Sequence, residues 1–276
     1  MRYVLPIIAA LAATPVLADE TLLTLDGGVA ATLSMPDAEG PFPGVLMLHG
    51  FGSSRDEVGG MYATEAAALA EVGIASLRID FRGFGQSAGD TGHHTVDRQN
   101  EDAAVGLAAL TATGGVDASR IGVLGFSFGG GAAIQLAAAH PDAVKSLVTW
   151  SSVGDYHVDF LQSMGQATFD QAAEAGIIGL DLGWRTIALK DTFFSSLSQH
   201  GILGDLAQYA GPFLSITGSQ DYYAMYAPLM QAAAAGDDTQ ALVIEGADHI
   251  YHVFDPSASS VAQVISVTTA RFLATL

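Results

Sequence analysis

The sequence contains no cysteine, which excludes disulfide bonds, a thiol nucleophile, a cysteine-ligated metal and a lipoprotein anchor. The folded chain must therefore be held together without covalent cross-links. With 276 residues, half of them hydrophobic, it is long enough to bury the core of one large α/β domain.

Basic residues are scarce as well. Ten lysines and arginines stand against 29 aspartates and glutamates, which gives a net charge of −19. Such a surface repels nucleic-acid phosphates and anionic lipid, so we expect neither a nucleic-acid partner nor a membrane-surface role. The acidic charge is compatible both with a saline habitat and with simple solubility.

Long apolar runs are absent beyond the first residues. Met1-Arg2 gives a positive start, residues 4–11 are mostly apolar, and small residues precede Asp19. This pattern predicts a secretory signal peptide over residues 1–18, too short to span a bilayer, with a buried N-terminal helix as the alternative. We therefore expect a periplasmic or secreted protein without membrane insertion, whose mature part is one domain over residues 19–276.

Strand and helix patterns alternate along most of that domain. Hydrophobic alternation or short apolar runs predict strands at residues 21–25, 29–34, 45–48, 74–79, 121–124, 146–150, 213–217 and 241–244. Helical patterns fall at residues 56–72, 96–110, 130–140, 225–235 and 258–273. This alternation is typical of a doubly wound α/β fold with a mainly parallel sheet.

Residues 152–210 break the alternation. They contain Trp184, Phe193 and Phe194 and indicate several short helices inserted between two strands. An insertion at the carboxyl ends of parallel strands would cover an active site as a cap. An enlarged helical crossover is the alternative.

Gly125-Phe126-Ser127-Phe128-Gly129 is the most informative motif. It follows an apolar strand and precedes an alanine-rich helix, so Ser127 lies at the apex of a sharp turn. A Gly-x-Ser-x-Gly turn of this kind exposes the serine hydroxyl above the sheet, and the glycines avoid collisions with the neighbouring strand and helix. We predict Ser127 as a catalytic nucleophile.

A serine nucleophile requires a base and an orienting carboxylate. Asp221 and His249 each follow a predicted strand, in the chain order Ser, Asp, His that this type of turn requires. Both should therefore lie at the same sheet edge as Ser127. The competing residues are His252 as base, Asp155 or Asp248 as acid, and His93-His94 as a metal pair, for which no third ligand stands at metal-site spacing.

The oxyanion of an acyl-transfer intermediate needs hydrogen-bond donors. His49-Gly50-Phe51-Gly52 follows a buried strand, and glycines there let the main chain approach the serine turn. The backbone N–H groups of Phe51 and Phe128 are the expected donors, and His49 is expected to be structural.

These motifs together resemble the α/β-hydrolase superfamily. The ordered elements are residues 49–52, residues 80–87, the Ser127 turn, Asp221 and His249. Residues 49–57 resemble the serine esterases that include bacterial cinnamoyl and feruloyl esterases, and also members similar to dienelactone hydrolases and prolyl oligopeptidases. The resemblance implies an eight-stranded sheet, a hydrolytic activity and no cofactor or metal.

The sequence thus predicts a serine carboxylesterase for small esters with short-chain or aryl acyl groups. Trp184, Phe193, Phe194, Tyr222 and Tyr223 are candidates for an apolar substrate pocket, although aromatic residues of an insertion often form its own small core. A serine peptidase on the same triad is the alternative, with a substrate amine held by one of the insertion carboxylates Asp159, Asp170, Glu174 and Asp181. A catalytically silent scaffold would show a lost triad member, which this chain does not. The oligomeric state is left open.

Overall fold

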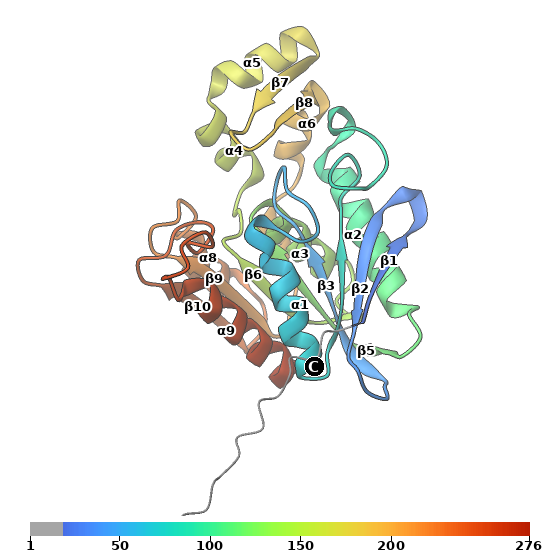
Figure 1. The fold of residues 1–276 in the computed structure, drawn as a ribbon. Helices are drawn as coiled ribbons and strands as arrows, with labels where there is room; N and C mark the ends of the chain where they lie inside the picture. The colour runs from blue at the N-terminus through green and yellow to red at the C-terminus, as the bar shows by residue number, and fades with distance from the viewer. Residues whose placement is uncertain (1–18) are drawn as a thin grey trace, which may run out of the picture.

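The computed structural model describes residues 19–276 and contains a sheet of eight strands in the order β1-β2-β4-β3-β5-β6-β9-β10. Figure 1 shows the sheet at the centre of the molecule with helices on both faces. The strands are β1 Asp19–Thr24, β2 Ala30–Met35, β3 Phe42–Leu48, β4 Ala75–Ile79, β5 Val116–Phe126, β6 Val144–Trp150, β9 Phe213–Gly218 and β10 Thr239–Ile244.

Strand direction divides the sheet into two parts. β1 pairs with β2, and β2 with β4, in antiparallel fashion, whereas β4, β3, β5, β6, β9 and β10 run parallel. Val45, Leu46, Met47 and Leu48 in β3 are fully buried, as expected of a central strand covered on both faces. The predicted doubly wound, mainly parallel eight-stranded sheet is confirmed.

Two hydrophobic cores lie on the two faces of the sheet. Helices α1 Met61–Glu71 and α9 Ser260–Thr275 cover one face, with Tyr62, Leu69 and Phe272 fully buried. Helices α2 Val96–Thr111, α3 Phe128–Ala139 and α8 Tyr226–Ala233 pack into the core on the other face. Because parallel strands end at one edge, the loops that follow β3, β5, β9 and β10 meet there.

Most of the segment between β6 and β9 lies beyond that edge, at the top of Figure 1. The segment consists of α4 Tyr156–Met164, α5 Gln166–Ala175, β7 Ile177–Asp181, β8 Thr186–Lys190, α6 Asp191–Ser196 and α7 Ile202–Leu206. Its last helix, α7, instead packs against α3 and α8. β7 and β8 form an antiparallel hairpin. The expectation of helices alone in this segment was wrong, because five-residue strands with one or two buried residues each give too short an alternation to detect.

Helix α1 begins later than predicted. It starts at Met61, after a single 3-10 turn over Val58–Gly60, and not near residue 56. Asp56 instead lies within ion-pair distance of the buried Arg78, 3.2 Å from its Nε, and Glu57 has a positive φ of 61° that no helix accepts. Similar 3-10 turns occur at Asp26–Gly28, Thr91–His93 and Leu197–Gln199.

The predicted signal peptide at residues 1–18 lies outside the described residues. From residue 19 onward, none of the helices has the length and apolar character needed to cross a membrane.

Two buried histidines lie within an aromatic cluster beneath the carboxyl edge. The His94 ring lies 4.8 Å from that of Phe84, and the His49 ring lies 4.7 Å from that of Phe81. Burial lowers the pKa of His49 to about 4 and that of His94 to about 3. Both imidazoles are therefore neutral in the folded protein at neutral pH.

Neutral buried histidines make stability depend on pH. In the unfolded chain they bind protons near pH 6.5, whereas in the folded protein they do not until pH 4 or below, so their contribution is complete above pH 6.5 and falls as the pH drops. As the pH falls from 6.5 to 5, the lowered pKa of His94 should reduce the free energy of unfolding of the wild type by about 2 kcal/mol. His94→Phe should abolish this part of the pH-dependent loss of stability.

Urea unfolding of wild type and His94→Phe at pH 7 and pH 5 measures the difference. Buried carboxyls with raised pKa, such as Glu57 and Glu65, titrate in the opposite sense but are common to both proteins and cancel. His140→Gln, at an exposed histidine, serves as the control and should behave as wild type. An identical pH dependence in His94→Phe and wild type would contradict the account.

Candidate active site

Ser127 occupies a strained turn between β5, which ends at Phe126, and α3, which begins at Phe128. Its φ of 53° and ψ of −120° are unfavourable for a residue with a side chain. Such strain persists only where the surrounding structure enforces it, and it concentrates at functional sites. The predicted strand, turn and helix are all present.

The two glycines of the motif are required by close backbone approaches. A Cβ at Gly125 would lie 2.3 Å from the carbonyl oxygen of Gly129, and one at Gly129 would lie 2.2 Å from that of Leu48. The next two positions are equally crowded, since a Cβ at Gly130 or Gly131 would collide with Ser152 or Tyr156. The turn thus fits between the end of β3 and the residues that follow β6 only with glycine at these positions.

Ser127, His249 and Asp221 lie together at the carboxyl edge of the sheet. Ser127 Oγ is 3.1 Å from His249 Nε2, and His249 Nδ1 is 2.9 Å from Asp221 Oδ1. Asp221 follows β9 and His249 follows β10, so the two loops bring residues 28 positions apart in the sequence into contact. The three predicted residues form one continuous hydrogen-bonded chain.

Asp221 is held in place by several donors. Its Oδ2 accepts from Thr217 Oγ1 at 3.1 Å, and its Oδ1 accepts from the N–H of Tyr223 at 3.0 Å. Burial alone would raise the pKa of Asp221, but the hydrogen bond and charge of His249, together with the other hydrogen bonds to the carboxylate, outweigh it and leave the pKa below its ordinary value. An ionised Asp221 assigns the imidazole proton to Nδ1, so Nε2 can accept the proton of Ser127.

Phe51 and Phe128, the predicted oxyanion donors, both lie beside Ser127. Both residues line the cleft at Ser127, and neither N–H donates to a protein acceptor within residues 19–276. Phe128 is the first residue of α3, where an N–H has no partner within the helix. Free donors beside a nucleophile are what an oxyanion requires.

Glu57 fixes the loop that carries Phe51. Its carboxylate accepts hydrogen bonds from the N–H of Gly50, from Ser53 Oγ at 2.9 Å and from the N–H of Val58 at 2.8 Å. Burial raises its pKa, although these hydrogen bonds counteract the effect. The sequence analysis included Glu57 in the segment 49–57 that carries the family resemblance but assigned it no role. The one indication in the sequence was its proximity, seven residues, to Gly50.

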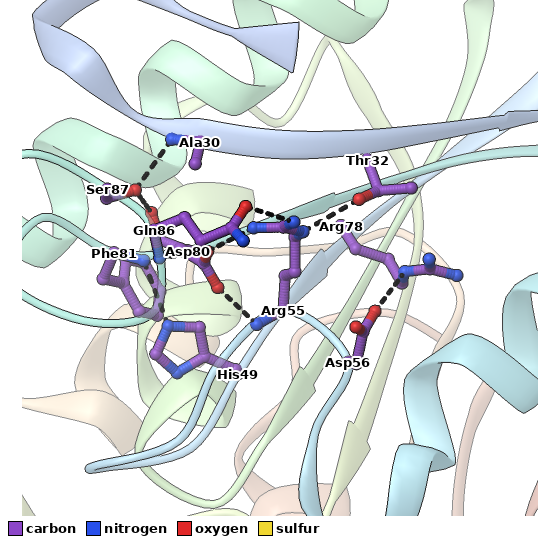
Figure 2. Close-up of polar contacts among 10 residues, drawn as sticks. All are labelled: Ala30, Thr32, His49, Arg55, Asp56, Arg78, Asp80, Phe81, Gln86 and Ser87. Atoms are coloured by element: carbon purple, nitrogen blue, oxygen red, sulfur yellow. Dashed lines mark hydrogen bonds and ion pairs between the residues drawn. The ribbon is translucent and has the colours of Figure 1, made fainter. Parts of the chain in front are cut away.

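A second buried carboxylate joins this loop to residues 80–87. Asp80 accepts from the N–H of Arg55 at 2.6 Å, forms an ion pair with Arg55 Nη1 at 2.5 Å and accepts from the N–H of Gln86 at 2.8 Å. Figure 2 shows Arg55 extending from Asp80 to Thr32 and Gln86, while His49 Nε2 accepts the N–H of Phe81 at 3.0 Å. The two motifs singled out in the sequence are thus parts of one network, and His49 has the structural place expected of it.

A cleft of about 1000 Å³ opens above Ser127. Most of its wall is apolar, and the wall is formed by the Phe51 and Ser127 segments, by α4 and the start of α5, and by the β7–β8 hairpin. The side chains that define it are Phe51, Phe126, Phe128, Val153, Phe160, Met164, Leu180, Leu182, Trp184, Tyr223, Ile250 and Phe254. A cleft of this size accommodates a small organic ligand.

The structure corrects three of the predicted pocket residues. Trp184 lines the cleft as expected, and Tyr223 does so 5.3 Å from the His249 ring. Phe193 and Phe194 are buried and do not reach the wall, because Phe193 packs beneath Phe51 at 5.4 Å as part of the aromatic core. Tyr222 is 55% exposed and does not line the cleft.

The competing residues have other positions. Asp155 caps α4 by accepting the N–H of Val158 at 2.9 Å. Asp248 accepts the N–H groups of Ile250 and His252, which shapes the loop around His249. His93 contacts Asp90 and Lys190, and within the described part of the chain no three potential ligands gather at a metal-binding spacing.

Sequence comparisons identify relatives of this chain. Residues 41–179, just over half of the chain, match the protein family described as serine aminopeptidase, S33. An uncharacterised 31.7 kDa protein encoded in the traX-finO intergenic region of Escherichia coli is 32% identical over 48% of this chain and 44% of its own length. Esterase FrsA of Klebsiella pneumoniae is 32% identical over 46% of this chain and 30% of its own length. The chain thus aligns with less than half of each of these relatives.

Solved structures resemble the chain over nearly its whole length. Est1E of Butyrivibrio proteoclasticus, with ferulic acid bound, has a TM-score of 0.72 at 21% identity and covers 92% of this chain and 98% of its own. A structure of DcsB with a substrate analogue has a TM-score of 0.78 at 15% identity over 94% and 100% of the two chains. Dienelactone hydrolase of Anabaena variabilis has a TM-score of 0.67 at 18% identity over 94% and 99%. At these identities the likeness establishes the fold alone.

Proposed function

The chain belongs to the serine aminopeptidase S33 family of the α/β-hydrolase superfamily, and we propose that within it the protein is an exported serine carboxylesterase. Its substrates are small esters with short-chain or aryl acyl groups. The observation that carries the proposal is the hydrogen-bonded chain from Asp221 through His249 to Ser127 in the wall of an apolar cleft.

The first half of the reaction acylates Ser127. His249 Nε2 takes the hydroxyl proton as Ser127 Oγ attacks the ester carbonyl carbon, and Asp221 stabilises the imidazolium that results. The N–H groups of Phe51 and Phe128 donate to the oxyanion, and one such donor typically contributes about 3 kcal/mol of transition-state stabilisation. The intermediate collapses when His249 gives its proton to the departing alkoxide, which leaves as the alcohol.

The second half returns the enzyme to its starting state. Water occupies the position of the alcohol and gives a proton to His249 as its oxygen attacks the acyl carbonyl. The new tetrahedral intermediate uses the same two N–H donors. Its collapse breaks the bond to Ser127, and His249 returns its proton to Ser127 Oγ as the carboxylic acid leaves.

The character of the cleft supports esters over peptides. An aminopeptidase needs a carboxylate that holds the substrate ammonium, and of the four insertion carboxylates considered only Asp181 lines the cleft. Asp159 is buried, where it accepts from Tyr226 Oη at 2.7 Å. Glu57 also lines the cleft, but its carboxylate is occupied by three protein donors. Serine aminopeptidase activity is the second candidate because the family description names it.

A substrate panel separates the two candidates. We expect wild type to hydrolyse p-nitrophenyl esters in the series from acetate to laurate, with the highest kcat/KM among the short ones, and methyl ferulate if aryl acyl groups fit. An aminoacyl p-nitroanilide should not be turned over. Ser127→Ala should lower ester turnover by a factor on the order of 10⁶ without unfolding the protein.

Ser119→Ala is the matched control, since Ser119 is exposed at the opposite end of β5. It should retain wild-type rates, and circular dichroism should show both variants folded. If folded Ser127→Ala keeps more than about a tenth of the activity, the assignment of Ser127 as the nucleophile is wrong. Preferential cleavage of the anilide would move the protein to the peptidases.

Export is proposed from residues 1–18 alone. When the full chain is expressed with its own N-terminus in a Gram-negative host, the periplasmic fraction should contain a protein that begins at Asp19, because the small residues before it form the cleavage site. N-terminal sequencing and intact mass measure this directly. Retention of Met1 in a cytoplasmic product would contradict it.

A further inference from the structure

Arg185 lines the cleft above Ser127, and its contacts leave its guanidinium available to bind a ligand. Arg185 follows the tip of the β7–β8 hairpin and lines the otherwise mainly apolar cleft. Its side chain crosses to the loop after β3, where Nη1 donates to the carbonyl oxygen of Gly52 at 3.2 Å. The guanidinium carbon lies 5.5 Å from the centre of the Phe84 ring, within the range of a cation–π contact.

The guanidinium of Arg185 has no carboxylate partner in the part of the chain that the structure describes. The arginine ion pairs found within residues 19–276 do not include Arg185. Asp181 also lines the cleft, but it is exposed and its Oδ1 accepts the N–H of Gly183 at 2.9 Å. A guanidinium has five N–H donors in a planar fork, and the one contact to Gly52 leaves most of them available to a ligand. In a chain of net charge −19, Arg185 is the arginine that this cleft offers to an anionic ligand.

The position of Arg185 relates it to the reacting ester. Gly52 directly follows Phe51, whose N–H is an oxyanion donor in the proposed mechanism. Backbone dimensions limit the distance from the Phe51 nitrogen to the Gly52 oxygen, and hence place Arg185 Nη1 within about 11 Å of that donor. A substrate whose ester carbonyl lies at Ser127 can therefore reach the guanidinium through a short methylene chain or one aromatic ring.

We propose that Arg185 forms an anion subsite and that the preferred substrates are esters that carry a carboxylate, on either the acyl or the alcohol part. The fork of the guanidinium matches the two oxygens of a carboxylate, and the apolar wall accommodates the carbon chain between the two polar ends. The inference deepens the proposed esterase function and rests on it. A cation at this position attracts an anionic ester, whereas it would repel the ammonium group of an aminopeptidase substrate.

Matched pairs of esters test the subsite. For the acyl side, 4-nitrophenyl hydrogen glutarate is compared with its neutral methyl-capped diester. For the alcohol side, 4-acetoxybenzoate is compared with its neutral methyl ester. Wild type should favour the anionic member of at least one pair in kcat/KM, and the favoured pair identifies which part of the substrate carries the carboxylate.

Arg185→Gln should lower the anionic-to-neutral ratio of that pair by about ten- to a hundredfold, the effect expected for a lost hydrogen bond to a charged group. The ratio is the readout because any disturbance of the Gly52 loop acts on both members alike. Arg120→Gln removes the same charge at the other end of β5, where Arg120 pairs with Asp117, and should leave the ratio unchanged.

The outcomes distinguish this inference from the proposed function. A wild-type ratio that Arg185→Gln does not change, with neutral esters still hydrolysed, would overturn the anion subsite and leave the esterase intact. An equal fall of the ratio in both arginine variants would also overturn it, because net charge would then be the cause. Failure to hydrolyse any ester would instead overturn the proposed function.

Discussion

The buried carboxylate of Asp80 is the contact on which the geometry of the active site depends. It holds the backbone and the guanidinium of Arg55, and so fixes the loop that carries Phe51 against the end of β4. A buried ion pair is weak evidence for stability, since desolvation offsets the attraction. Its contribution here is positional: an oxyanion donor misplaced by 1 Å stabilises little. Gly85 completes the arrangement, because a Cβ at its position would lie 2.2 Å from the Asp80 carboxyl carbon.

Backbone strain concentrates at the same sheet edge. The five non-glycine residues with positive φ found within residues 19–276 are Glu57, Ser127, Ser151, Tyr251 and His252. Each lies in a segment that follows a parallel strand, and the polar contacts of Glu57, Ser151 and Tyr251 hold these conformations in place. Such conformations cost about 1–3 kcal/mol each and persist where surrounding contacts over-determine them. The rest of the fold, two apolar cores on a parallel sheet, supplies the stability that permits this.

The parts of the protein that the sequence predicted are those governed by local rules. A Gly-x-Ser-x-Gly turn between strand and helix has a characteristic geometry, and loops that follow parallel strands lie at one sheet edge. Ser127, Asp221 and His249 could therefore be placed together from the sequence alone. The cleft could not be predicted in the same way. Whether Phe193 lines a cleft or packs beneath Phe51 depends on how α6 sits on the aromatic core, and Arg185 gains its place only through the unpredicted β7–β8 hairpin. Glu57 lies in a segment that the sequence predicted as helical, whereas in the structure it has a positive φ and its carboxylate accepts the N–H of Gly50.

Covalent labelling of Ser127 tests the central claim, that its hydroxyl is the nucleophile activated by His249. Wild type, His249→Gln and Ser119→Ala are treated with a fluorophosphonate, and intact mass and peptide mapping locate the adduct. The account predicts one adduct per chain, on Ser127, in wild type and Ser119→Ala, with labelling slowed by at least about a hundredfold in His249→Gln because the general base is lost. An adduct on another residue, or equally fast labelling of Ser127 in His249→Gln, would contradict it.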